Sequence, residues 1–117
     1  MDIKLQHVNL DYVEEIAGGD NSFKKELIQI FLGQIPDFVV NMEKYLAEDN
    51  RDELAKEAHT AKSSVLIFRM EETGNLLKKI QLCAENDEIG SIPELMNLVK
   101  SDLKSASEEL TEILTEL

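Results

Sequence analysis

The chain has 117 residues and a formal net charge of −12, from 24 acidic and 12 basic side chains. That length suits one domain with a single hydrophobic core, and we expect this domain to span residues 1–117. Because a surface this negative repels phosphate backbones and anionic lipid, nucleic acid and membrane surfaces are poor partners.

Cysteine content and hydropathy indicate the cellular compartment. The one cysteine, Cys83, cannot form an internal disulfide, which is typical of a reducing compartment. The longest apolar runs hold about four residues, whereas a membrane span needs roughly 20, and no signal peptide is recognisable. We therefore expect a cytoplasmic monomer. Met1 suits a natural N-terminus, although an excised domain of a larger kinase would read the same way.

Helical patterns account for the chain, so the predicted class is all-α. A short helix is expected from Leu10 to Ala17, ended by Gly18-Gly19. Asp20 or Ser22 then caps a long helix. Its predicted inward stripe consists of Phe23, Leu27, Phe31, Gln34, Phe38, Met42 and Tyr45.

Two positions within that long helix are unusual. Pro36 lacks a backbone N–H and comes shortly after Gly33, so a kink is expected there. Gln34 is polar on an inward stripe, and a buried amide needs a hydrogen-bond partner. Gln34 indicates either a polar site between helices or a core glutamine bonded to backbone.

The next two predicted helices are the one that contains His59 and the one that follows it. Asn50 with Glu53 is a capping box for a helix from about Arg51 to Phe68. A tight connection at Arg69-Met70 leads into a further helix that ends in the polar run 85–88. The expected core face of that helix is Leu76, Leu77, Ile80, Cys83 and Ala84.

The last helix is expected to open at Ser91, with Glu94 as its capping partner. Its apolar residues recur at alternating steps of four and three, which is the seam of a bundle helix. They are Ile92, Met96, Val99, Leu103, Ala106, Leu110, Ile113 and Leu117. Four long helices with short connections predict an up-down antiparallel four-helix bundle, with the short N-terminal helix packed across one end.

His59 lies near the middle of its predicted helix but outside the apolar stripe of Leu54, Ala58, Ala61, Val65 and Phe68. Lys62 and Ser63 follow at i+3 and i+4, on the same strip of surface, and the Lys62 side chain is expected to be exposed. The residues around the ring are small, which is expected to clear space for another protein: Ala55, Ala58, Ala61, Ser63 and Ser64. An accessible imidazole beside a cation suits a histidine that accepts a phosphoryl group, which brings about two negative charges.

The run His59-Thr60-Ala61-Lys62-Ser63-Ser64 resembles the H-x-x-K-G-S signature of histidine-containing phosphotransfer (HPt) domains. The likeness extends over nearly the whole chain. The segment 12–23 is similar to the family's first helix and acidic turn, 31–36 to its aromatic-to-proline segment, and 82–85 to the end of the helix after the histidine.

Three positions depart from that family's pattern. Ser63 and Arg69 stand where the family usually has glycine, and Ala61 stands where a larger apolar residue is frequent. The change at Arg69 puts the geometry of the helix-helix turn in question. None of the three removes the nucleophile or Lys62.

The resemblance implies that His59 shuttles a phosphoryl group between receiver-domain aspartates in a multistep two-component phosphorelay. The chain would be a phosphocarrier without a cofactor or metal of its own, since the partner receiver or hybrid kinase supplies Mg²⁺ and most of the catalytic machinery. Lys62 would offset charge on the transferring group. Gln34 matches a family position that can hold the ring or the phosphoryl group.

Further site residues follow from the predicted helix packing. Gln81 falls opposite His59 if the following helix is antiparallel, with Lys78 one turn away. The expected docking face for a receiver holds Ala55, Ser63, Leu66 and Ile67, although Leu66 and Met70 fit packing against a neighbouring helix equally well.

Other functions fit the sequence less well. A helical interaction module could bind a receiver or kinase without phosphotransfer, or inhibit a kinase by binding alone. A dimeric kinase phosphoacceptor domain is disfavoured, because Thr60 and Ser64 stand where that class carries an acidic residue and a proline. The chain has no Gly-rich phosphate loop, and His7 is too far from His59 in the sequence for a zinc constellation, so we expect His7 at the surface or at a helix end.

Overall fold

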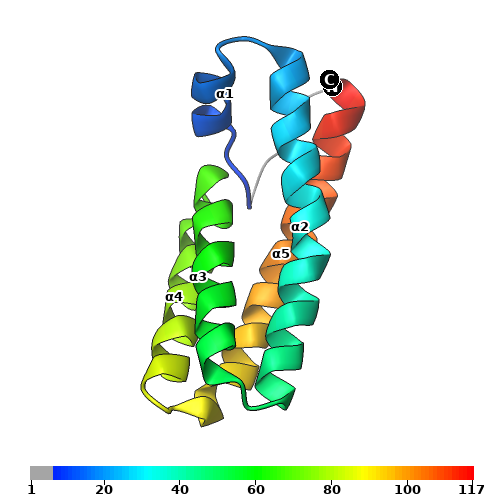
Figure 1. The fold of residues 1–117 in the computed structure, drawn as a ribbon. Coiled ribbons are helices and arrows are strands. Elements are labelled where there is room, and N and C mark those ends of the chain that lie inside the picture. Colours follow the sequence, from blue (N-terminus) through cyan, green and yellow to red (C-terminus); the bar gives the residue numbers. More distant parts are fainter. Residues whose placement is uncertain (1–6) are drawn as a thin grey trace.

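Four long helices lie side by side in an antiparallel bundle, and a short helix covers one end (Figure 1). The computed structural model describes residues 7–117. Its helices are α1 (Asp11–Ala17), α2 (Asn21–Ala47), α3 (Arg51–Ile67), α4 (Glu71–Glu85), the short 3₁₀ helix η1 (Ile89–Ser91) and α5 (Ile92–Glu116). The pairs α2–α3, α3–α4, α4–α5 and α5–α2 are in contact. The predicted all-α, up-down four-helix bundle is confirmed, whereas one domain over residues 1–117 stays a prediction.

Side chains at the helix starts explain where two of the long helices begin. Asp20 caps α2, because its carboxylate accepts from the backbone N–H groups of Ser22 at 2.9 Å and Phe23 at 3.2 Å. The Asn50 side chain accepts from the N–H of Glu53 at 3.4 Å at the start of α3. The last helix opens with Ser91 at its N-cap position, as predicted, but without the expected side-chain capping bond. Ser91 has helical dihedrals and makes no side-chain capping bond, because η1 runs directly into α5.

The core follows the predicted seam most closely in α5. All seven predicted positions of α5 from Ile92 to Ile113 are buried, and Leu117 just beyond the helix is half-buried. In α4 the buried face is Thr73, Gly74, Leu77, Ile80 and Ala84, so it is rotated slightly from the prediction. Cys83 is half-buried at the edge of this face. Among the helices described, none is both long and apolar enough to cross a membrane.

The buried face of α2 differs from the predicted stripe. The residues that point inward are Ile28, Phe31, Ile35, Phe38 and Met42. Phe23 is 37% exposed and Gln34 is half-buried, whereas Ile28 and Ile35, which the predicted stripe left out, are buried where α2 packs against α3 and α5. Pro36 lies inside a continuous helix, and the expected kink there stays a prediction.

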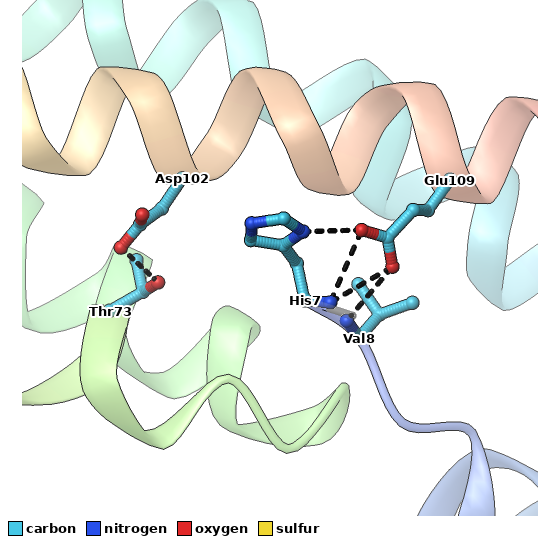
Figure 2. Close-up of polar contacts among 5 residues, drawn as sticks. All are labelled: His7, Val8, Thr73, Asp102 and Glu109. Atoms are coloured by element: carbon cyan, nitrogen blue, oxygen red, sulfur yellow. Dashed lines mark hydrogen bonds and ion pairs between the residues drawn. The ribbon is translucent and has the colours of Figure 1, made fainter. Parts of the chain in front are cut away.

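The N-terminal segment is fastened to α5 (Figure 2). The Glu109 carboxylate accepts from the backbone N–H groups of His7 at 3.0 Å and Val8 at 3.3 Å, and it also contacts the His7 ring nitrogen Nδ1. His7 is exposed, as expected, and Val8 is buried. Nearby, the buried Thr73 hydroxyl donates to Asp102 at 2.8 Å, which joins α4 to α5 (Figure 2). These contacts hold His7, Val8 and α4 against one face of α5.

The turn between α3 and α4 keeps a left-handed residue although the family glycine is absent. Arg69 has φ +57°, and its guanidinium lies 5.3 Å from the centre of the Tyr12 ring on α1. This cation–π contact is worth about 0.5–1 kcal/mol at an exposed site and offsets part of the backbone strain. The preceding Phe68 ring stacks on Phe31 with centroids 4.5 Å apart. The turn is therefore fixed by α1 and α2 together.

Replacement by alanine should have opposite effects on stability at two glycines. Gly18 ends α1 with φ +58°, a region that disfavours a Cβ, so Gly18→Ala should destabilise the protein by about 1 kcal/mol. Gly33 lies inside α2, where an added Cβ would meet nothing within 4 Å, so Gly33→Ala should stabilise by about 0.5–1 kcal/mol. Urea unfolding of both variants measures this. A stabilised Gly18→Ala protein would contradict the assigned C-cap.

Candidate functional site

His59 stands on the outer face of α3, away from the bundle core. Its side chain is exposed, whereas Ala58 immediately before it and Ala61 two residues later have no exposed surface. Successive residues on a helix turn by about 100°, so burying Ala58 and Ala61 directs His59 outward. The ring is therefore held by a rigid helix and is open to a second macromolecule.

A hollow of about 630 Å³ lies beside His59, between α3 and α4. The α3 side is formed by residues spaced along one helix face, and the α4 side by two residues one turn apart. The lining residues are Asp52, Ala55, Lys56, His59, Thr60, Gln81 and Glu85. The hollow therefore leaves open space directly beside the imidazole.

Hydroxyl groups on either side of His59 bond back to their own helix. The Ser63 hydroxyl donates to the His59 carbonyl oxygen at 3.2 Å, and the Thr60 hydroxyl donates to the Lys56 carbonyl oxygen at 3.0 Å. Both side chains stay close to the α3 backbone as a result. Ser63 is exposed and small, so no bulky side chain projects from this part of the α3 surface although the family glycine is absent.

Lys62 is placed differently from the expectation of a fully exposed side chain. It is half-buried, and its Cγ lies 3.7 Å from where a Cβ on Gly74 of α4 would stand. Its aliphatic stem therefore packs over α4, as long cationic side chains often do. Lys62 does not line the hollow. The lysine that does is Lys56, one turn before His59, which the sequence analysis did not single out.

The structure brings only one of the two candidate glutamines to this hollow. Gln81 lies across from His59 on α4, and its Nε2 donates to the Glu85 carboxylate at 3.1 Å. Gln34 on α2 is half-buried and does not line the hollow, and neither does the exposed Lys78. Sequence reasoning also missed Glu85. Glutamate is common in this acidic chain, and only the packing of α4 against α3 shows that Glu85 borders the hollow.

The small residues near His59 serve packing more than access. Ala58 and Ala61 are sealed against neighbouring helices, and only Ala55, 6% exposed, reaches the hollow. The burial of Ala58 and Ala61 confirms that they belong to the predicted apolar stripe of α3, so these two residues are not themselves part of the open surface. Of the predicted docking residues, Leu66 is 40% exposed and Ile67 is half-buried against the core. Met70 is buried, so it packs inside the bundle.

The charges of the hollow do not form a metal centre. One lysine, Lys56, stands against two carboxylates, those of Asp52 and Glu85, and Lys56 also pairs with Glu53 at 3.4 Å. Within residues 7–117, His, Cys, Asp and Glu side chains form no group of three suited to a metal ion. The site offers an imidazole nucleophile, a neutral amide and nearby charge, which suits group transfer to and from a partner.

Comparison with known proteins agrees with the fold and identifies the family. A family model described as Hpt domain matches residues 26–117, which includes His59 and all of α3, α4 and α5. The fold is similar to the crystal structure of histidine-containing phosphotransfer protein B (HptB) from Pseudomonas aeruginosa PAO1, with a TM-score of 0.89 over 97% of this chain and 99% of that one. The two sequences are 11% identical, so this likeness concerns the fold. No curated protein sequence matches the chain significantly.

Proposed function

This chain belongs to the Hpt domain family, and from that membership we propose that it is a monomeric phosphocarrier that relays a phosphoryl group between receiver-domain aspartates through His59. The observation that carries the proposal is the exposed imidazole of His59 beside an open hollow on a rigid helix. A receiver can bring its aspartyl phosphate to this ring without unfolding any part of the bundle.

The chemistry divides between the two proteins. A ring nitrogen of His59 attacks the phosphorus of an aspartyl phosphate, the bond from phosphorus to the aspartate oxygen breaks, and the carboxylate leaves. The reverse step delivers the group to a second receiver. The receivers hold the Mg²⁺ that offsets phosphoryl charge, and this chain contributes the position of the nucleophile and the nearby polar groups. The fixed helix reduces the entropy lost when the reacting atoms align.

Removal of the nucleophile distinguishes this function from binding alone. His59→Gln should abolish the acid-labile label that a phosphorylated receiver leaves on the protein, because glutamine has no nucleophilic ring nitrogen. The free energy of unfolding should change by no more than about 0.5 kcal/mol, as for other surface substitutions, since the side chain is exposed. The melting temperature and the helicity should therefore stay nearly unchanged. Phosphate label and circular dichroism measure the two effects.

Label that persists on His59→Gln would refute the assignment of this histidine. A protein that never takes up label but still binds receivers, or still inhibits a kinase, would instead be a helical interaction module. In that case the His59→Gln variant would keep its binding activity intact.

The charge of Lys62 is proposed to act on the transferring phosphoryl group. Lys62→Ala should slow transfer or shorten the phosphorylated lifetime, by roughly threefold to tenfold if about 1 kcal/mol of charge interaction is lost. Lys62→Met keeps the stem that packs near Gly74 and should show the same kinetic loss with less effect on stability. Lys62→Arg should retain most of the rate. The phosphotransfer rates and the lifetimes of the phosphorylated proteins are measured in time courses of label transfer. Rates and lifetimes equal to those of the wild type in all three variants would reject the role.

The outer face of α3 is proposed as the receiver-docking surface, with the exposed Ser63 and Leu66 and the less accessible Ala55 and Ile67. Ser63→Trp should slow transfer from a receiver at least tenfold, because the exposed Ser63 is one turn from His59 and a bulky ring blocks close approach. Labelling by the small donor phosphoramidate should continue.

The matched control is Ser101→Trp on the exposed face of α5, which should leave both reactions unchanged. Loss of receiver transfer in both tryptophan variants would place docking elsewhere or indicate a general folding effect.

A further inference from the structure

We propose that Glu85 is a positioning residue for phosphotransfer. It holds the side-chain amide of Gln81 while His59 is unmodified, and it yields that amide when a phosphoryl group arrives. The inference rests on the proposed function, because it concerns the same hollow. It adds a residue on α4 that acts through another side chain and touches neither the ring nor the phosphoryl group itself.

The geometry of the hollow gives the first part of the argument. Gln81 and Glu85 lie one turn apart on α4, and Gln81 Nε2 donates to Glu85 Oε2 at 3.1 Å. Among the described residues, these two form the whole α4 side of the hollow that holds His59. Gln81 is half-buried and Glu85 is exposed. This hydrogen bond favours the orientation in which the amide lies at the α4 wall of the hollow.

The chemistry of the acceptors gives the second part. A carboxylate and a phosphoryl group compete for the same amide N–H groups, and an amide nitrogen carries two of them. The phosphoryl group brings about 1.5–2 negative charges on three oxygens, so it is the stronger acceptor once it is present. Gln81 can turn its amide from Glu85 toward the phosphoryl group while α4 stays in place.

The charge of Glu85 gives the third part. The hollow is lined by Asp52, Lys56 and Glu85, so a phosphoryl group on His59 meets more negative than positive charge there. Lys62 does not line the hollow, and its stem packs near Gly74. Like charges raise the proton affinity of the phosphoryl group, and a donated amide hydrogen bond lowers it. Glu85 therefore acts in two ways, by its own charge and by holding the donor.

The test uses the full chain and a donor that needs no receiver. Phosphoramidate labels the protein when a ring nitrogen of His59 bonds to phosphorus, the bond from phosphorus to the donor nitrogen breaks, and ammonia leaves with the imidazole proton. The proton affinity of the bound phosphoryl group is then read from a ³¹P NMR titration. The Gln81 side-chain amide is followed in ¹H–¹⁵N spectra before and after labelling.

Glu85→Gln should lower the proton affinity of the phosphoryl group about threefold, and Gln81→Ala should raise it by a similar factor. In the Gln81→Ala background the effect of Glu85→Gln should shrink, because only the direct charge effect remains. The Gln81 amide signals should move on labelling of the wild type. Glu88→Gln, which removes the same charge from an exposed residue outside the hollow, should match the wild type.

Labelled protein in which Glu85→Gln behaves like Glu88→Gln, or in which the Gln81 amide signals do not move, would overturn this inference alone. Full additivity of the two substitutions would also overturn it, because Glu85 would then act without Gln81. Failure of both phosphoramidate and phosphorylated receivers to label His59 would overturn the proposed function and this inference with it.

Discussion

The close packing of α3 on α4 is the constraint on which the site depends. Ala58 and Ala61 are sealed in the core, and Gly74 leaves room for Leu66, whose Cδ2 lies 3.0 Å from where a glycine-to-alanine Cβ would stand. Small residues let two helix backbones approach closely, and the polar residues on their outer faces then border one shared hollow. A larger residue at these contacts would separate His59 from Gln81 without touching either of them.

The ends of this helix pair are held by elements that take no part in the chemistry. Phe68 stacks on Phe31 of α2, Arg69 lies over Tyr12 of α1, and the backbone N–H of Asn9 donates to the Phe68 carbonyl oxygen at 2.9 Å. Together with the Glu109 contacts on α5 (Figure 2), they join residues 7–9 and α1 to the α3–α4 turn and the bundle. A nucleophile on such a scaffold keeps its geometry when a partner docks, which is what proximity-based transfer requires.

The accuracy of sequence reasoning differed between helices for a physical reason. In α5 one continuous heptad-like seam lies between two neighbours, so periodicity predicted every buried position from Ile92 to Ile113. In α2 apolar residues occupy more than one face, and periodicity alone could not decide between Leu27 and the buried Ile28. Periodicity placed Ala58 and Ala61 correctly on the buried stripe, but it could not show whether their small size also serves access, because a small residue looks the same in a sequence whether it serves access or close helix packing.

The sequence by itself determined the helical class, the order of the helices, the outward position of His59 and the family signature around it, since all of these depend on local spacing along one chain segment. Only the tertiary structure decided which residues from α4 share the hollow with that ring. It placed Gln81 and Glu85 there, left Gln34 out, and turned the Lys62 stem over Gly74. These placements depend on the distance and rotation between helices, which side-chain packing sets and which a pattern within one helix does not contain.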